Sequence, residues 1–430
     1  MPIKLLVTAD LHLGRTSSAV PKSSEENATK YTWKRLVKYA VDNNIDAVAL
    51  AGDVVDRDNR FYEAIGPLQE GFEILGEAGI PVVMVSGNHD FDVLPDILKS
   101  DKYDHVHLLG KKGRWEQITV QCGEEYIQFL GWSFPKQHIN QDPSSAYDVK
   151  ELDPNLPTVG LLHGDVYDKN SNYAPIELSN LVTSHVDSWI IGHMHKPDIL
   201  NNNAPLILYP GSPHALSAKE SGPHGPNIMT LGDGDSISIE QLALSPVRYE
   251  TFTIDITGID DETDFRDRLV GDLTDWVQDQ PEEFEHASSV VFDVELNGRH
   301  TNLTEFDQWT QFAGEFEQVL LGDTEVSIRK VKNLAEPEVE NLEQLAGQPN
   351  PPGTIAKMIL DLENGEDSEF LNDFMSEFED SLEKINRNKT YRPLKIREEQ
   401  ELMDLSETKD LLLRECRHLL AELLSQNEQL

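Results

Sequence analysis

The sequence has little cysteine. Its 430 residues include only Cys122 and Cys416, which lie far apart in the chain. Neither has a second cysteine at the short spacing of a zinc site, and two isolated residues do not form a disulfide framework. We therefore expect two reduced thiols and no structural zinc.

Long apolar segments are also missing. No run approaches the roughly 18 apolar residues of a membrane span, and the segment from Met1 to Val7 lacks the apolar region and cleavage site of a signal peptide. The apolar fraction of 38% still supports a sizeable core, and the length fits two or three domains. These features predict a cytoplasmic protein without a membrane segment.

Positive charge is scarce. Lys and Arg number 36 against 77 Asp and Glu, which gives a net charge of −41. Proteins that bind nucleic acid usually carry a basic stripe, so the charge alone argues against a polyanionic partner. Bound divalent cations and concentrated salt weaken that argument, because salt at 1 M screens charges within roughly 3 Å. The acidity fits a halophilic protein as well as an ordinary acidic one.

Short apolar segments alternate with helical segments over the first 245 residues. The clearest strand, 81–85, ends in Gly87-Asn88-His89-Asp90. Similar strands are expected at 3–9, 46–51, 158–162 and 188–191, with helices at 23–41 and 61–78. This alternation predicts an α/β domain with substantial parallel pairing, helices on the sheet faces and ligands at the carboxyl ends of the strands.

The pattern changes after residue 245. Segment 249–332 reads as alternating strands and helices, with strands at 249–256, 288–296 and 324–331 and helices at 262–277 and 303–319, which predicts a small α+β domain. The predicted domains are 1–245, 246–333, a proline-rich linker at 334–353 and a helical tail at 354–430 with helices at about 354–385 and 396–426. The tail either binds a partner or packs within the chain. A basic cluster at 384–397 is either a solvated connector or an anion contact.

Side chains that bind metals follow five of the expected strands. They are Asp10, His12, Asp53, Asn88, His89, His163, His193 and His195. Each alone is a weak signal, but carboxylate, imidazole and amide groups together suit Mn²⁺, Fe²⁺ or Zn²⁺. Their number suggests two ions, with Asp53 bridging them at a spacing of about 3.5–4 Å. A hydroxide between the ions would then attack a phosphate ester, without a Ser or Cys nucleophile.

These ordered motifs resemble the signature of the calcineurin-like metallophosphoesterases. The matching segments are Asp10-Leu11-His12, Gly52-Asp53-Val54-Val55-Asp56, Gly87-Asn88-His89-Asp90, His163-Gly164-Asp165 and Gly192-His193-Met194-His195. The resemblance implies a four-layer α-β-β-α core. It also implies one metal on Asp10, His12, Asp53 and His195, and a second on Asp53, Asn88, His163 and His193. His89 would be an acid outside the ligand sets that stabilises or protonates the leaving oxygen.

The longer first motif, Asp10-Leu11-His12-Leu13-Gly14, is similar to that of the SbcD group of DNA repair exonucleases, including YhaO-like members. This resemblance implies a Mn²⁺-dependent DNA exonuclease and leaves endonuclease activity open. It further implies that 249–332 is a capping domain and that the tail helices dock an SbcC- or Rad50-like coiled-coil ATPase. A homodimer through the first domain is also expected.

Four further residues, in or next to the motifs, are expected to support the ligands or the substrate. Asp56, Asp90 and Asp165 are expected to surround the ligands, with Asp90 orienting an imidazole. Arg57 either contacts a substrate phosphate or pairs with a neighbouring Asp. The Asp56-Arg57 pair also resembles protein Ser/Thr phosphatases, although Asp58 stands where they have glycine. A phosphatase or small-nucleotide phosphodiesterase is therefore the alternative enzyme, and an inactive scaffold for an ATPase is the non-enzymatic alternative.

Overall fold

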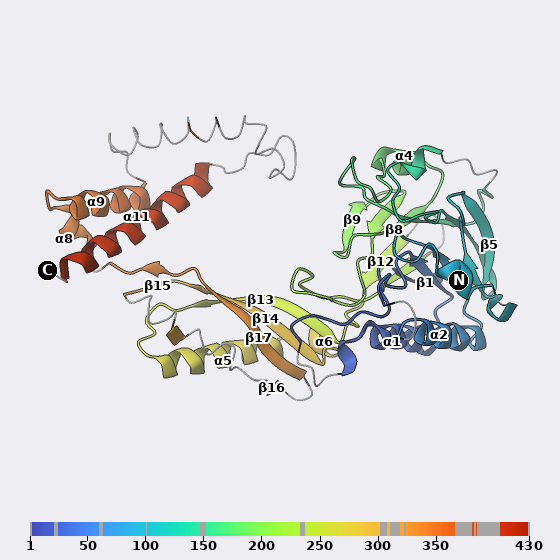
Figure 1. Ribbon diagram of the computed structural model, residues 1–430, viewed down its shortest axis with the longest axis horizontal. Coiled ribbons are helices and arrows are strands. Elements are labelled where there is room, and N and C mark those ends of the chain that lie inside the picture. The colour runs from blue at the N-terminus through green and yellow to red at the C-terminus, as the bar shows by residue number, and fades with distance from the viewer. Residues whose placement is uncertain are drawn as a thin grey trace. The chain divides into compact units, whose positions relative to one another are not determined.

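The computed structural model describes residues 2–20, 25–59, 63–99, 101–146, 152–232, 237–301, 319–321, 324–339, 341–365 and 405–428, with residues 308, 309, 381 and 384 (Figure 1). The chain divides into two compact units. The first comprises Met1–Thr251, Thr274–Asp293 and Phe316–Arg329, and the second comprises Phe252–Leu273, Val294–Glu315 and Lys330–Leu430. The domain boundaries expected after residues 245, 333 and 353 stay predictions.

The first six-stranded sheet has the order β12-β11-β1-β2-β3-β4. Strands β1 to β4 are parallel, and β11 and β12 continue the sheet in antiparallel fashion. Their bounds are β1 Ile3–Thr8, β2 Ala47–Ala51, β3 Val82–Val85, β4 Val106–Leu108, β11 Asn227–Leu231 and β12 Ile237–Gln241. The carboxyl ends of β1, β2 and β3 therefore lie at one edge of this sheet.

The second six-stranded sheet has the order β5-β6-β7-β8-β10-β9. Strands β6, β7, β8 and β10 are parallel, and the edge strands β5 and β9 are antiparallel to their neighbours. Their bounds are β5 Glu116–Cys122, β6 Glu125–Gly131, β7 Thr158–His163, β8 Ser188–Gly192, β9 Asp198–Asn201 and β10 Leu206–Tyr209. This sheet supplies the carboxyl ends of β7 and β8.

Side chains alternate between the two faces of each strand and so build separate layers. Val7, Ala49 and Val83 of the first sheet pack with Phe129 and Leu161 of the second. The helices on the first sheet's outer face are α1 (Thr29–Asp42) and α2 (Ile65–Glu77), which lie side by side, and α4 (Leu178–Val182) packs on the second sheet. The predicted four-layer α-β-β-α class is confirmed.

Short helical segments complete this part of the chain. They are η1 Glu25–Asn27, α3 Leu94–Ile97, η2 Asp101–Tyr103 and η3 Pro143–Ala146. Helix α1 begins at Thr29, later than the expected start at residue 23, and residues 21–24 lie outside the described part of the chain.

The α+β region contains a four-stranded sheet in the order β13-β14-β17-β16. Its elements are β13 Val247–Asp255, α5 Glu262–Gln278, α6 Pro281–Phe284, β14 Ser289–Asn297, β16 Val319–Leu321 and β17 Thr324–Asn333. The expected strands at 249–256, 288–296 and 324–331 and the helix at 262–277 agree with these elements. Most of the helix expected at 303–319 lies outside the described residues.

The tail helices pack against one another within the second unit. Helices α8 (Leu342–Ala346), α9 (Pro351–Asn364) and α11 (Leu405–Glu428) share a small core that includes Ala356, Ile359, Cys416 and Leu420. Two short paired strands, β15 Arg299–His300 and β18 Glu336–Pro337, belong to the same unit. Helix α8 falls inside the expected linker. Of the basic cluster at 384–397, all residues except Lys384 lie outside the described part of the chain. None of the described helices is long and apolar enough to cross a bilayer.

Candidate metal centre

The predicted ligands come from the carboxyl ends of five strands in two sheets. Asp10 and His12 follow β1, Asp53 follows β2, and Asn88 and His89 follow β3. His163 is the last residue of β7, while His193 and His195 follow β8. Because the two sheets pack face to face, these ends converge, and three groups with ligand atoms within 4.8 Å of one another form there. The groups are Asp10, His12 and His195; Asp10, Asp53 and His163; and His12, Asp56 and His89.

The backbone at this edge is strained. Asp10, His12, Asp53 and His193 have φ angles of 53°, 45°, 49° and 102°. These are four of the nine non-glycine residues with positive φ in the described chain, and each costs on the order of 1–3 kcal/mol. The concentration of strain at predicted ligands indicates that packing holds these side chains in place. Gly87 makes room beside them, because a Cβ there would lie 2.2 Å from Asp53 Oδ1.

Asp53 lies at the centre of the cluster. Its Oδ2 is 3.4 Å from His163 Nε2 and 4.0 Å from His12 Nε2. Its Oδ1 accepts a 2.8 Å hydrogen bond from the backbone N–H of His89. The carboxylate is therefore fixed on one oxygen and faces both sets of imidazoles with the other, as a bridging ligand would. The ligand assignment itself stays a prediction.

The nitrogens of His12 and His195 show that the site fits a cation. Their Nε2 atoms are 3.1 Å apart, and each Nδ1 faces a carboxylate instead. His195 Nδ1 is 2.7 Å from Glu220 Oε1, and His12 Nδ1 is 3.5 Å from Asp56 Oδ1. Protons on both Nδ1 atoms leave two Nε2 lone pairs facing each other beside Asp10, an arrangement that a divalent cation stabilises.

The second group surrounds His163. Its Nδ1 is 3.0 Å from the carbonyl oxygen of Ala51, and its Nε2 is 3.3 Å from Asn88 Oδ1. The His193 ring packs edge-on against His163 with centroids 5.5 Å apart. The backbone N–H of His193 donates to both oxygens of Asp10, at 3.1 and 2.9 Å. Carboxylate, imidazole and amide donors thus meet here, which suits a second divalent ion.

The charges of the cluster perturb its titration. Burial raises the pKa of Asp53, but the charge and hydrogen bond of His163, followed by the charges of His12 and His89, hold it below its usual range. Burial lowers the pKa of His163, but Asp53 outweighs burial and raises it to about 9. A proton on His163 balances the buried charge of the Asp53 carboxylate. A cation that binds the His163 imidazole would therefore release this proton.

His89 occupies the open side of the centre. Its side chain is 32% exposed, whereas that of His163 is 0% exposed. Its Nδ1 is 3.6 Å from Asp56 Oδ1, the same oxygen that faces His12. Burial lowers the pKa of His89, but the bond to Asp56 and the charges of Asp53, Asp56 and Asp90 outweigh burial and raise it. A partly exposed imidazole that favours its proton is suited to protonating a leaving group.

Asp90 is buried and accepts hydrogen bonds from backbone N–H groups. Its Oδ1 accepts from the N–H of Gly87 at 2.8 Å, and its Oδ2 accepts from the N–H groups of Val54 and Val55 at 2.6 and 3.3 Å. These bonds join the loops after β2 and β3, and the expectation that Asp90 orients an imidazole stays a prediction. A buried carboxylate satisfies three backbone donors that the two strained loops leave without partners.

Asp165 and Arg57 lie at the edges of the site. Asp165 Oδ1 accepts from the backbone N–H groups of Tyr167 and Asp168, at 2.9 and 3.0 Å, and so shapes the loop after β7. The backbone nitrogen of Arg57 is 3.4 Å from His89 Nδ1, and the Arg57 side chain is exposed. The nearby Asp56 Oδ1 lies 4.0 Å from Arg15 Nε. Whether Arg57 contacts a substrate stays a prediction.

Glu220 is the contact that the sequence did not indicate. It reaches His195 from a loop 25 residues further along the chain and belongs to none of the motifs. Burial raises the pKa of Glu220, but the hydrogen bond and charge of His195 outweigh burial and lower it. No periodicity or spacing marks this residue, because only loop closure brings it to the histidine.

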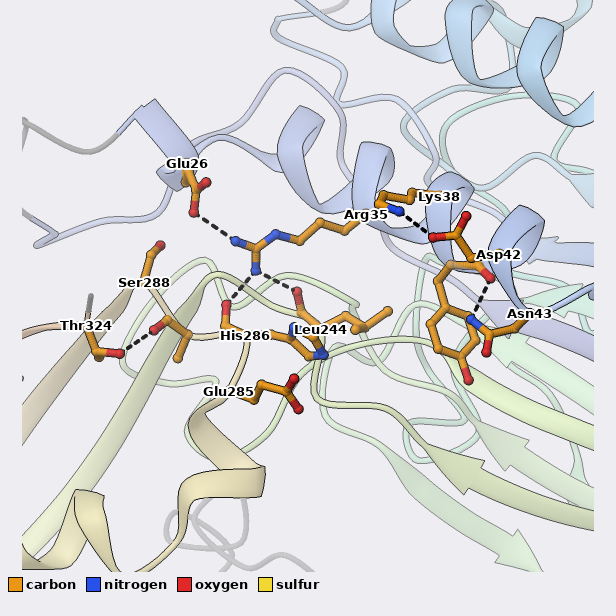
Figure 2. Close-up of a pocket in the computed structure, with 12 residues that line it drawn as sticks. Glu26, Arg35, Lys38, Asp42, Asn43, Leu244, Glu285, His286, Ser288 and Thr324 are labelled. Carbon is orange, nitrogen blue, oxygen red and sulfur yellow. Dashed lines mark hydrogen bonds and ion pairs between the residues drawn. The ribbon is translucent and has the colours of Figure 1, made fainter. Parts of the chain in front are cut away.

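A separate pocket of about 680 Å³ lies in the first unit. Figure 2 shows the guanidinium of Arg35, on α1, between the Glu26 carboxylate and the carbonyl oxygens of Leu244 and His286. The Glu26 bond measures 2.8 Å. None of the pocket's lining residues is a predicted ligand, and Arg35 is occupied by these structural contacts.

Comparison with known proteins finds a family that matches part of the chain. Residues 3–197 match the family of calcineurin-like phosphoesterases. This segment holds every predicted ligand and both sheets' parallel strands up to β8. Over these residues the chain is similar to the calcineurin-like phosphoesterases, a family whose members use divalent metals.

Curated relatives narrow the resemblance. The chain is 28% identical over 257 residues to the uncharacterized metallophosphoesterase YhaO of Bacillus subtilis, covering 58% of this chain and 62% of that protein. It is 26% identical to the SbcD subunit of the SbcCD nuclease of the same organism, covering 51% and 64%. It is 24% identical to DNA double-strand break repair protein Mre11 of Methanosarcina mazei, covering 72% and 48%. The expected likeness to the SbcD group is confirmed, over less than two thirds of each of these relatives.

Solved structures also share similarity with this chain. TT1561 of Thermus thermophilus is 14% identical, with a TM-score of 0.35, covering 56% of this chain and 99% of that one. A dimetal phosphatase from Danio rerio is 13% identical, with a TM-score of 0.36, covering 56% and 98%.

Proposed function

We propose that this chain is a DNA exonuclease that hydrolyses phosphodiesters with two bound divalent ions, most simply Mn²⁺. The observation that carries the proposal is the buried cluster of carboxylate, imidazole and amide donors centred on Asp53. The choice of DNA as substrate is supported by relatives named as a nuclease subunit and as a double-strand break repair protein.

The ligands divide into two sets that share Asp53. Asp10, His12 and His195 would hold one ion, and Asn88, His163 and His193 the other. Such a pair of ions, when bound, supplies the nucleophile and neutralises charge on the phosphate. The chain's own contribution is then to orient the ester and to manage protons. His89, held by Asp56, donates a proton to the leaving oxygen, which is worth about 10²–10⁴-fold in rate.

The helical tail, residues 354–430, would bind a partner protein. We infer that helices α9 and α11 dock a coiled-coil ATPase of the SbcC type and that the first domain forms a homodimer. Leu419 on α11 is 49% exposed beside the packed face that contains Leu420. An exposed leucine on a helix whose other face is already covered supports a partner surface. Deletion of residues 354–430 should abolish association with the purified ATPase and leave metal binding intact; unchanged association would refute the docking role.

The substrate is tested with end-labelled duplex DNA and Mn²⁺. Purified protein should release nucleotides from the ends, and chelation of the metal should stop the reaction. The alternative is a phosphatase or small-nucleotide phosphodiesterase, which the net charge of −41 favours because it opposes the approach of DNA. Inert DNA together with rapid hydrolysis of a phosphoprotein or a cyclic nucleotide would establish that alternative.

A further inference from the structure

We propose that Glu220 is a positioning residue that sets the orientation and basicity of His195 for the ion on the Asp10 and His12 side of the centre. This inference rests on the proposed metal-dependent function, but it concerns metal affinity and not the identity of the substrate.

The contact fixes which nitrogen of His195 faces the centre. Glu220 Oε1 lies 2.7 Å from His195 Nδ1. A carboxylate can only accept, so Nδ1 carries the proton and donates it. The other nitrogen, Nε2, then presents its lone pair at 3.1 Å from His12 Nε2, inside the group formed with Asp10. Glu220 therefore selects the tautomer that a metal ligand requires.

Glu220 is itself held by the backbone of its own loop. Its Oε2 accepts a 2.6 Å hydrogen bond from the backbone N–H of Leu216, and its own N–H donates to Ser217 O at 2.8 Å. Its side chain is only 13% exposed. The loop is anchored at both ends, because Ser18 N–H donates to Leu216 O and Gly222 N–H donates to Tyr249 O, each at 2.9 Å. The carboxylate thus has a fixed position from which to orient the ring.

Two other imidazoles have weaker supports. His163 Nδ1 faces a neutral carbonyl, that of Ala51, at 3.0 Å. His12 Nδ1 lies 3.5 Å from Asp56 Oδ1, a longer contact than the 2.7 Å between His195 and Glu220. A short bond to a charged acceptor polarises an imidazole more than either of these. Loss of Glu220 should therefore lower the metal affinity of the site that contains His195. The affinity of the site that contains Asn88 and His163 should change little.

The experiment is a titration of the full-length, metal-free chain with Mn²⁺ by isothermal calorimetry, without DNA. Wild type should show two sites. Glu220→Ala should weaken one of them by about 10–100-fold and leave the other unchanged. Glu220→Gln should have a smaller effect, because its amide oxygen still accepts from Nδ1 but carries no charge. Lys219→Ala, on the same loop, is the matched control and should bind as wild type does.

The outcomes separate the possible roles. The proposal would be overturned if Glu220→Ala bound Mn²⁺ at both sites with wild-type affinity. It would also be overturned if Glu220→Gln lost affinity equally at both sites. If Glu220→Ala loses both sites together with thermal stability, Glu220→Gln decides, since a selective loss there supports positioning. Mn²⁺ binding at two sites in a wild-type protein that does not cleave DNA would reject the proposed substrate and leave the role of Glu220 standing.

Discussion

At the scale of single residues, two carboxylates of the centre each present one oxygen to two imidazoles. One oxygen of Asp56 faces both His12 and His89, and one oxygen of Asp53 faces His163 and His12. A change at either carboxylate therefore alters a predicted ligand and the predicted acid together. Substitutions at the imidazoles separate these roles more cleanly, and His89 is the most informative of them.

We expect His89→Ala to retain two Mn²⁺ ions per chain and to lose about 10²–10⁴-fold in turnover. The reason is that the His89 side chain is partly exposed and its Nδ1 faces Asp56, which is not a predicted ligand of either ion. Metal content from mass spectrometry and release of nucleotides from labelled DNA measure the two properties. His185→Ala, an exposed histidine outside the motifs, is the control. Loss of metal together with activity would make His89 a ligand.

His214 provides a pH dependence of stability away from the metal centre. It is fully buried between Ser17 and Thr32, with ring nitrogens 2.8 and 2.7 Å from their hydroxyl oxygens. Burial lowers its pKa from 6.5 to about 4. Below pH 6.5 the unfolded chain therefore binds a proton that the folded protein does not bind, and stability falls as the pH falls.

The expected loss is up to about 1.4 kcal/mol per pH unit between pH 6.5 and 5.0. Urea unfolding of wild type and His214→Gln at a series of pH values measures it. The variant should be less stable at every pH but should show a shallower slope over this interval. Equal slopes would assign the pH dependence to other groups.

At the scale of elements, the tail helix α11 is tied down by charge as well as by apolar packing. Arg417 is 3% exposed, forms an ion pair with Glu363 of α9, and lies 3.3 Å from Glu336 of β18. Arg299 of β15 contacts the same two glutamates, at 2.9 Å and 3.8 Å. Four charges from four elements therefore form one network within the second unit.

Arg417→Met should loosen α11 because it removes a buried cation and leaves two partly buried glutamates facing each other. The cost should fall below the about 3–5 kcal/mol of a fully buried pair, since both glutamates are about a quarter exposed and Arg299 remains. Hydrogen exchange of amides 405–428 should accelerate. Arg414→Met, on an exposed face of the same helix, should leave exchange unchanged. Equal rates in both variants would show that apolar packing alone holds the helix.

At the scale of the whole molecule, the net charge of −41 sets the response to salt. Mutual repulsion destabilises the compact state, and raising salt from 0.1 M to 1 M shortens the screening length from about 10 Å to about 3 Å. We expect the Tm to rise over this range, measured by circular dichroism in KCl. Replacement of the exposed Asp260, Asp267 and Asp275 by Asn should raise the Tm at low salt and reduce the gain. A Tm independent of salt would contradict this account.

The sequence by itself determined the class of fold and the set of candidate ligands. Apolar strands, regular alternation with helices and polar motifs directly after the strands are local signals, and the motifs at Asp10, Asp53, Asn88, His163 and His193 stand where those strands end. Parallel pairing then brings the ends together, so local pattern and general topology were sufficient.

Only the tertiary structure decided how these groups are supported. Asp90 proved to bind backbone N–H groups of two loops, because strained turns leave such donors without partners. Glu220 reached His195 through loop closure, and Arg417 joined elements more than fifty residues apart. Such contacts carry no periodicity and no fixed spacing, since they depend on where independent segments meet in space. Short motifs predict which chemical groups the site contains. Packing between distant parts of the chain determines how these groups are positioned.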